Sequence, residues 1–248
     1  MKILCVIPAR YASTRLPGKP LALIGNKTMI ERVYERACKA QMPDKVLVAT
    51  DHETVAATVV AFGGDAVMTL SSHPTGTDRL AEVAGKMPKY ELIINVQGDE
   101  PLIEPAVIDS LAEAFRHEPN LQMATLATVM DDEDYKNPNV VKVVVDKQDY
   151  ALYFSRSHIP YPRVAAGQPV YKHIGIYAYK RDFLLKYAKL ESSPLEKTES
   201  LEQLRALEYG YRIKVVQTNF QSVGVDTPED LQKVCDIINA LEEKECKK

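Results

Sequence analysis

The first half of the chain alternates short apolar runs with longer amphipathic segments. Four apolar runs predict β-strands: Ile3–Ile7, Val46–Ala49, Ala66–Thr69 and Leu92–Val96. Between and after these runs, apolar residues recur every three or four positions, which predicts helices over Met29–Ala40, Glu53–Phe62, Asp78–Lys86 and Ala106–His117. Because strands and helices alternate, the pattern predicts a Rossmann-like α/β fold with a mostly parallel sheet and helices on both faces.

From about Met123 the pattern becomes richer in strands. Residues 140–156, VVKVVVDKQDYALYFSR, predict a hairpin that turns at Lys147–Asp149. Residues 173–179, HIGIYAY, predict another strand. No flexible linker precedes this part of the chain, so we expect an antiparallel extension of the first sheet and not an independent domain.

The last third returns to helical periodicity. A helix is predicted over Pro194–Tyr209, because its leucines share one side and Gly210 follows as a stop signal. A strand is predicted over Arg212–Gln217. Thr227 opens a final helix, with Pro228 at its first position and an acidic residue three positions after the threonine, as in a capping box.

Polar loops follow the predicted strands of the first half. In a parallel sheet such loops gather at the carboxyl ends of the strands, where ligands bind. The first of them, PARYASTRLPGKP, brings Arg10, Arg15 and Lys19 among small and hydroxyl side chains. This is typical either of a polyphosphate site or of a basic surface turn. The chain has no GxGxxG, and Gly18-Lys19 is followed by a proline, so a classical NAD site and a P-loop are disfavoured.

Two aspartates are candidate metal ligands. Asp99 follows a buried strand in the sequence QGDE, and Asp226 precedes the Thr-Pro helix start. Each aspartate has two interpretations. The structural one is that Asp99 caps the next helix and that Asp226 is the residue before a helix cap; the functional one is that each carboxylate is an oxygen ligand of a hard cation. Magnesium is commonly held by one or two carboxylates together with substrate phosphates, so the pair would suit a magnesium–polyphosphate site.

A third loop, HPTGTDR, offers hydroxyls and an unhindered backbone that could read the edge of a base. The structural alternative is a helix cap, with Thr77 at the N-cap position. Arg156 and His173 lie at the ends of strand-like runs, where lone residues of this kind are more often structural. Glu202 and Gln203 fall on the polar side of their predicted helix, where simple solvation is the alternative.

Composition narrows the class of protein. The 248 residues include 46% apolar and 26% charged residues, with a formal net charge of −3, which disfavours nucleic-acid binding and a polybasic membrane surface. The four cysteines are scattered, without disulfide or zinc spacing, and no apolar run is long enough to span a bilayer. These features lead us to expect a cytoplasmic protein that binds neither nucleic acid nor a membrane.

Seven segments, in order over almost the whole chain, resemble the 3-deoxy-manno-octulosonate (KDO) cytidylyltransferases. They are IPARYASTRLPGKPL, NVQGDEP, TGTDRLAEV, YALYFSRSHIP, KHIGIYAY, SPLEKTESLEQLRALEYG and GVDTPEDL. The opening pattern is shared by other cytidylyltransferases for acid sugars, whereas YALYFSR and SLEQLRALEYG are much more specific to the KDO branch. One departure is Thr75-Gly76-Thr77, where the family usually has Ser-Gly-Thr.

The resemblance implies the roles of particular residues. Arg10, Lys19, Asp99 and Asp226 would be catalytic, and the two aspartates would hold Mg²⁺. The nucleotide site would comprise Pro8, Ala9, Arg10, Ser13, Arg15, Lys19, Thr75, Gly76, Arg79 and Gln97. The sugar acid would contact Arg156, His173, Tyr177, Glu202 and Gln203.

The resemblance also implies an organisation and a reaction. A single nucleotidyltransferase domain would span 1–248, with a CTP-binding lobe at about 1–122, a sugar-binding and dimerisation lobe at about 123–217, and a C-terminal segment at about 218–248 that returns to the metal site. CTP and KDO would give CMP-KDO and diphosphate for lipopolysaccharide synthesis, in a homodimer. The alternatives are a cytidylyltransferase for 8-amino-KDO or sialic acid, a nicotinamide-dependent oxidoreductase, and a non-catalytic sensing module.

Overall fold

The computed structural model describes residues 1–12, 16–164 and 169–245, and the chain divides into two compact units. Unit 1 comprises Met1–Asp109 and Ser222–Lys248, and unit 2 comprises Ser110–Gln221. The first boundary falls inside helix α4 (Pro105–His117), earlier than the change of pattern near residue 123. The C-terminal segment belongs to unit 1, so this unit is formed from both ends of the chain.

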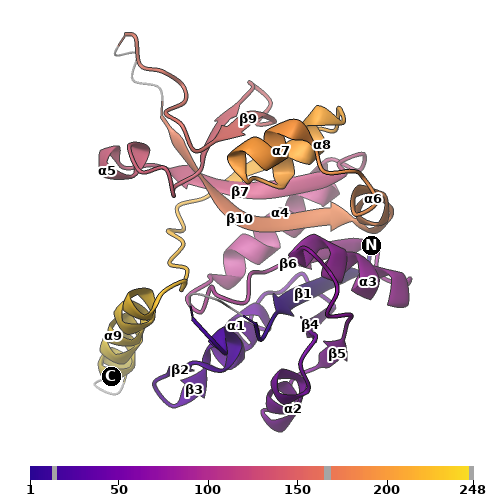
Figure 1. Ribbon diagram of the computed structural model, residues 1–248, viewed down its shortest axis with the longest axis vertical. Helices are drawn as coiled ribbons and strands as arrows, with labels where there is room; N and C mark the ends of the chain where they lie inside the picture. The colour runs from indigo at the N-terminus through magenta and orange to yellow at the C-terminus, as the bar shows by residue number, and fades with distance from the viewer. Residues whose placement is uncertain (13–15, 165–168, 246–248) are drawn as a thin grey trace. The chain divides into compact units, whose positions relative to one another are not determined.

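The four strands predicted in the first half are all present and form a parallel sheet in unit 1 (Figure 1). They are β1 (Ile3–Ala9), β4 (Lys45–Thr50), β5 (Ala66–Met68) and β6 (Leu92–Asn95), in the order β6-β1-β4-β5. Strand β1 is central and almost entirely buried, as its unbroken apolar run predicts. The predicted α/β fold class is therefore confirmed.

The strand order reverses beside β1. The chain moves from β1 to β4 and β5 on one side, and then returns to place β6 on the other side. Strand β1 pairs with β6 only as far as Val6, opposite Asn95, but with β4 as far as Ala9, opposite Thr50. The carboxyl ends of β1 and β6 therefore separate at the switch point, which is where a doubly wound sheet binds its ligand.

The four helices predicted in the first half are also present. They are α1 (Met29–Ala37), α2 (Glu53–Ala61), α3 (Gly76–Lys86) and α4. The predicted N-cap of α3 is wrong: Thr75, and not Thr77, accepts a hydrogen bond from the Asp78 amide in a full capping box. Thr77 lies within the first turn and is buried, so the helix begins two residues before the position that we expected.

The C-terminal helix α9 (Pro228–Glu245) begins at the predicted place, where the Asp230 carboxylate accepts from the amide and hydroxyl of Thr227. Its apolar side, Val234 and Ile238, packs with Val225, with Ile24 of the short strand β2 (Leu23–Ile24) and with Met29 at the start of α1. The 3₁₀ helix η1 (Lys19–Leu21) and a second short strand, β3 (Lys27–Thr28), lie in the same segment before α1. The sequence pattern does not predict these three short elements. The contact of Ile24 and Met29 with α9 fixes the C-terminal segment to unit 1.

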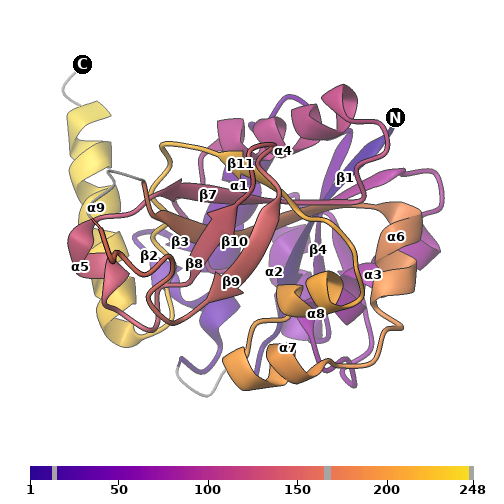
Figure 2. The same ribbon diagram turned by 90° about the horizontal axis from the view of Figure 1, so that it is seen from above.

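Unit 2 contains the strand-rich region (Figure 2). Strands β7 (Met123–Val129) and β10 (Tyr171–Lys180) are antiparallel, and β11 (Lys214–Gln217) runs parallel to β7. The predicted hairpin is confirmed as β8 (Lys142–Val145) and β9 (Ala151–Ser155), and β8 pairs with β10. The antiparallel part of the prediction is thus correct, although strand β7 was not predicted.

The single helix predicted over Pro194–Tyr209 is wrong. Two short helices, α7 (Pro194–Glu199) and α8 (Gln203–Glu208), are separated by a break at Ser200, whose φ of 52° is left-handed. A buried ion pair between Glu196 and Arg205 joins the two helices across the break. Unit 2 also contains two helices that the pattern did not predict, α5 (Asp132–Tyr135) and α6 (Arg181–Tyr187).

Across the described ranges 1–12, 16–164 and 169–245, no helix has the length and apolar composition needed to cross a membrane.

Candidate active site

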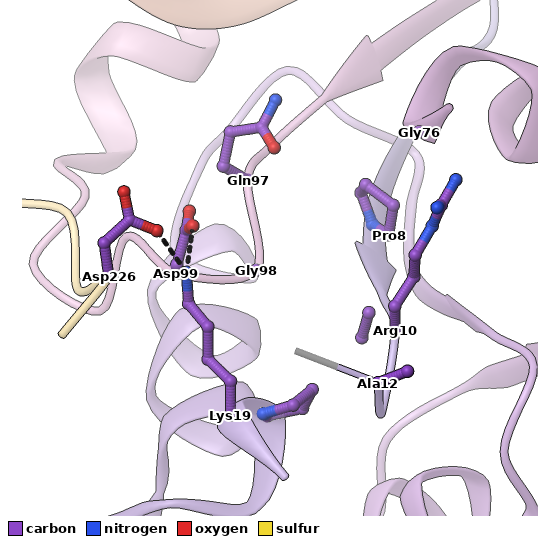
Figure 3. A pocket seen from close by; sticks show the side chains of 11 residues that line it. Pro8, Arg10, Ala12, Lys19, Gly76, Gln97, Gly98, Asp99 and Asp226 are labelled. Atoms are coloured by element: carbon purple, nitrogen blue, oxygen red, sulfur yellow. Dashed lines mark hydrogen bonds and ion pairs between the residues drawn. The ribbon is translucent and has the colours of Figure 1, made fainter. Parts of the chain in front are cut away.

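A cavity of about 440 Å³ opens at the switch point of unit 1, beyond the ends of β1 and β6 (Figure 3). Its lining comes from the ends of both strands, from η1, from the start of α3 and from the segment before α9. The lining residues are Pro8, Ala9, Arg10, Ala12, Lys19, Pro20, Gly76, Gln97, Gly98, Asp99 and Asp226. Segments that are far apart in the sequence therefore meet in one pocket of a size suited to a small-molecule ligand.

One wall of the pocket depends on a glycine. A Cβ atom at Gly98 would lie 2.8 Å from the carbonyl oxygen of Pro8, so a side chain there would force the backbone segments apart. The absence of a side chain lets the loop after β6 approach the end of β1 closely. This close approach places Gln97 and Asp99 in the same pocket as Arg10.

Lys19 joins the two candidate metal ligands. Its Nζ atom lies 2.6 Å from Asp99 Oδ2 and 2.9 Å from Asp226 Oδ1. The lysine side chain is only 15% exposed, whereas the carboxylates are 32% and 48% exposed. Burial alone would lower the pKa of Lys19, but the two carboxylates more than offset it, so its pKa is raised above the ordinary value. Lys19 is therefore a permanently charged ammonium group between two anions.

The position of Asp99 excludes its interpretation as a helix cap, because the next helix begins only at Pro105 and the Asp99 carboxylate pairs with Lys19. Asp226 does precede the Thr227 capping box, but its carboxylate also points to Lys19 (Figure 3). The backbone brings the two aspartates together, since the Val225 amide donates to the Asp99 carbonyl oxygen at 2.9 Å. Asp226 is therefore the residue before the cap, and its carboxylate also faces the pocket beside Asp99.

The aspartate pair fits a divalent cation. The two carboxylates already converge on one positively charged atom, the Lys19 ammonium nitrogen, which occupies a cation position between them. Within the described part of the chain no group of three or more His, Cys, Asp or Glu side chains could hold a metal ion. A site with only two carboxylates matches the way in which magnesium is bound jointly by protein and phosphate oxygens.

Arg10 lies on the opposite side of the pocket, next to Pro8 (Figure 3). Its Nη2 atom is buried and has no hydrogen-bond partner among the described residues, which is costly for a cation unless a ligand completes the site. The neighbouring Tyr11 ring stacks on His52, with 4.0 Å between ring centroids. Sequence reasoning missed this stack, because the two rings come from different loops.

The other predicted nucleotide contacts have different surroundings. Gly76 lines the pocket at the start of α3, and the Thr75 hydroxyl serves in the capping box. Arg79 is fully buried behind the pocket, where it pairs with Asp51 at 2.8 Å and contacts the Thr69 hydroxyl. It is not among the lining residues. Ser13 and Arg15 lie outside the described residues.

In unit 2, His173 and Tyr177 of the predicted sugar contacts lie together on β10, with ring centroids 5.5 Å apart. The His173 ring also meets the edge of Phe154. The residue keeps some exposed surface, but its imidazole is surrounded by these rings, and burial lowers its pKa from 6.5 to about 3. Burial likewise raises the pKa of Tyr177 well above its ordinary value. Both side chains are therefore neutral near pH 7.

Arg156 is held at the end of β9 by the last residue of α7. The Glu199 carboxylate accepts from the Ser155 hydroxyl at 2.6 Å and from the Arg156 amide at 3.0 Å. The Glu199 carbonyl oxygen accepts from Arg156 Nε at 2.8 Å. Sequence reasoning missed Glu199, because the helix predicted over Pro194–Tyr209 placed this residue in its interior, whereas it is the last residue of α7.

Glu202 and Gln203 follow directly after the Ser200 break. Simple solvation, the alternative interpretation of this pair, does not hold for Gln203, which is 5% exposed and has a buried Nε2 atom without a partner in the described part of the chain. Glu202 is partly buried, and its carbonyl oxygen accepts from the Tyr187 hydroxyl at 2.7 Å. A buried amide with an unused donor is typical of a site that a polar ligand completes.

Comparison with known proteins gives consistent results. The chain matches the cytidylyltransferase family over residues 4–213. It is 55% identical to the 3-deoxy-manno-octulosonate cytidylyltransferase of Fusobacterium nucleatum subsp. nucleatum, over the full length of both chains. It is 53% identical to the enzyme of the same name from Syntrophotalea carbinolica, covering 94% of this chain and 97% of that one.

A solved structure provides the corresponding comparison of folds. CMP:2-keto-3-deoxy-manno-octonic acid synthetase, complexed with CTP, superposes with a TM-score of 0.94 at 47% identity. The match covers 97% of this chain and 99% of that chain. The similarity therefore extends through both units.

Proposed function

We infer, because the chain belongs to the cytidylyltransferase family and within it to the 3-deoxy-manno-octulosonate branch, that it activates KDO with CTP. The products are CMP-KDO and diphosphate. The observation that supports this assignment at the site is the switch-point pocket, in which Lys19 pairs with two carboxylates and Arg10 lines the opposite side. Cations together with a carboxylate pair are what a magnesium-bound triphosphate needs.

The reaction is an in-line displacement at phosphorus. The anomeric oxygen of KDO forms a bond to the α-phosphorus of CTP, and the bond from that phosphorus to the bridging oxygen of diphosphate breaks. Diphosphate leaves with the electron pair, and the proton of the attacking hydroxyl is released. The pocket offers no activated side-chain nucleophile, so we propose direct transfer, with catalysis by positioning and charge neutralisation.

Each pocket residue then has a definite task. Arg10 would donate to the triphosphate through the guanidinium nitrogen that has no partner within the described chain. Lys19 would neutralise charge as diphosphate forms. Asp99 and Asp226 would hold magnesium, which supplies charge neutralisation for the phosphates and raises the acidity of the attacking hydroxyl. Gln97 and the backbone at Gly76 line the remaining wall, where the cytosine would lie.

The sugar acid is proposed to contact residues of unit 2. Arg156 is the partner of choice for its carboxylate, because a guanidinium binds a carboxylate in bidentate fashion. His173, Tyr177 and Gln203 would meet its hydroxyls. These side chains are buried or neutral, which suits recognition of uncharged hydroxyl groups.

The direct test is diphosphate release in the presence of CTP, KDO and magnesium, with each component omitted in turn. We expect release only from the complete mixture. Side-by-side turnover with KDO, 8-amino-KDO and sialic acid identifies the preferred acid sugar. Turnover with sialic acid and none with KDO would contradict the assignment.

Asp99 tests the magnesium proposal separately. Asp99→Asn should leave the fold intact but remove most turnover, because a neutral amide is a poor ligand for a hard cation. Circular dichroism and thermal unfolding check the fold, and a magnesium titration of the diphosphate-release rate checks the cause. Activity close to wild type at saturating magnesium would show that Asp99 serves only to hold Lys19.

We also propose that the protein is a cytoplasmic homodimer, with a product that enters lipopolysaccharide assembly. The segments YALYFSR and LEQLRALEYG are the proposed contact surface, and each carries an exposed apolar side chain, Leu152 and Tyr209. Light scattering tests the dimer. A monomer at micromolar concentration would contradict it.

A further inference from the structure

Thr125 lies on β7, and its side chain contacts His173, which is one of the predicted contacts of the sugar acid. The Thr125 hydroxyl oxygen lies 3.0 Å from His173 Nε2, 3.1 Å from the carbonyl oxygen of Ile174 and 2.9 Å from that of Ile176. Thr125 is fully buried. The hydroxyl therefore has three neighbours that could take its hydrogen, but it has only one hydrogen to donate.

The backbone determines which neighbour receives that hydrogen. Strands β7 and β10 lose register between Ile174 and Tyr177, so Gly175 and Ile176 form a bulge outside the ladder. Carbonyl oxygens have no hydrogen of their own, and a buried carbonyl without a donor is costly. The hydroxyl hydrogen is therefore committed to the carbonyl oxygens at the bulge, which leaves the hydroxyl lone pairs towards His173.

This commitment sets the tautomer of the imidazole. A neutral imidazole carries one N–H and one acceptor nitrogen, and the second hydrogen bond of the ring decides which is which. Because the Thr125 oxygen can only accept from His173, Nε2 must carry the hydrogen. Nδ1 is then the acceptor of the ring.

We propose that Thr125 is a specificity-determining positioning residue, which fixes His173 as a hydrogen-bond acceptor and so makes it read a hydroxyl group of the sugar acid. A lone pair on Nδ1 accepts from a hydroxyl but repels a carboxylate. The sugar must therefore present a hydroxyl to His173 and its carboxylate elsewhere, which fixes the orientation of the sugar. The proposal rests on the proposed function for the identity of the ligand, but not for the tautomer.

The tautomer can be measured without any substrate. The protein has five histidines, and comparison of wild type with His173→Gln assigns the His173 signals in long-range ¹H–¹⁵N spectra of ¹⁵N-histidine-labelled protein. We expect a neutral ring with the hydrogen on Nε2. A hydrogen on Nδ1, or a ring protonated at pH 7, would overturn the proposal directly.

Two substitutions of Thr125 connect the tautomer to activity. Thr125→Val removes the hydroxyl at nearly constant volume, and should give a mixed tautomer and a roughly three- to tenfold higher KM for KDO, with the KM for CTP unchanged. Thr125→Ser keeps the hydroxyl and should restore both readouts. Thr128→Val, at another buried threonine of β7 that contacts Gln221, is the matched control and should change neither.

The outcomes separate this proposal from the proposed function. If His173→Gln raises the KM for KDO but Thr125→Val does not, the inference fails and the cytidylyltransferase function stands. If neither substitution affects the KM for KDO, His173 does not contact the sugar, and the proposal that it recognises a sugar hydroxyl is refuted. If wild type releases no diphosphate with any acid sugar, the proposed function fails, while the tautomer measurement still tests the role of Thr125.

Discussion

The buried imidazole of His173 should make the stability of this protein depend on pH in a specific way. In the folded protein burial lowers its pKa to about 3, whereas the unfolded chain has the ordinary value of 6.5. Between these values the unfolded state binds a proton that the folded state does not. The contribution of the neutral ring to the free energy of unfolding is therefore fully present above about pH 7, and it is lost progressively as the pH falls from 6.5 towards 3.

The size of the effect follows from the two pKa values. At pH 7 only about a quarter of the unfolded imidazole is protonated, and at pH 5 nearly all of it is. Linkage then predicts a loss of up to about 2 kcal/mol between pH 7 and pH 5, and up to about 4 kcal/mol by pH 3. These are upper figures, because part of the residue remains exposed.

The assay compares urea unfolding of wild type and His173→Gln at pH 7 and pH 5, at one fixed protein concentration. The variant is less stable at both values, but it should lose about 2 kcal/mol less than wild type on acidification. His117→Gln, at a histidine whose side chain is 76% exposed, is the control for loss of an imidazole at the surface. Parallel losses in wild type and His173→Gln would show that the folded protein accepts the proton, and the reasoning would be wrong.

Three further substitutions test the remaining contacts. Lys19→Ala should slow turnover roughly 30- to 1,000-fold, as for loss of a preorganised donor at about 2–4 kcal/mol, and an unchanged kcat would place Lys19 outside the reaction. Asp51→Ala should lower the free energy of unfolding by about 3–5 kcal/mol, because it leaves the fully buried Arg79 without its counter-charge. Urea unfolding measures this loss, and a change below about 1 kcal/mol would contradict it. Glu199→Ala should raise the KM for KDO about tenfold and leave the KM for CTP unchanged, since it removes the carboxylate that holds the Arg156 backbone. Equal effects on both substrates would indicate general destabilisation.

The sequence predicts unit 1 well because its strands are buried on both faces. Such strands are continuous apolar runs, and the polar residues that follow them necessarily collect at one edge of a parallel sheet. Asp99 and Lys19 could be placed near each other on this basis alone. Asp226 could be named as a candidate partner of Asp99 from its loop before the Thr-Pro helix start, but the pattern does not predict the packing of α9 against β2 and α1 that brings it there.

Unit 2 is less predictable for physical reasons. The helix breaks at Ser200, but Leu201 and Leu204 beyond the break are still buried. The spacing of apolar residues therefore continues across the break, and the pattern predicts one helix where there are two. Strand β7 is rich in alanine and threonine, which give a weak strand signal. The role of Thr125 depends on a bulge in the partner strand, and register shifts leave no mark in the hydrophobic pattern.

The Lys19 ammonium and a divalent cation have to compete for the same pair of carboxylates. Without a cation, Lys19 holds Asp99 and Asp226 together and prevents two like charges from facing each other unscreened. Its removal therefore has two opposite consequences: the carboxylates attract a divalent cation more strongly, while the phosphates lose a donor. If Lys19 acts on the phosphates, Lys19→Ala lowers kcat but leaves or improves the affinity for magnesium, measured by calorimetry without nucleotide. A loss of magnesium affinity in that variant would instead mean that the lysine serves to shape the metal site, and the assignment of Lys19 to the triphosphate would have to be withdrawn.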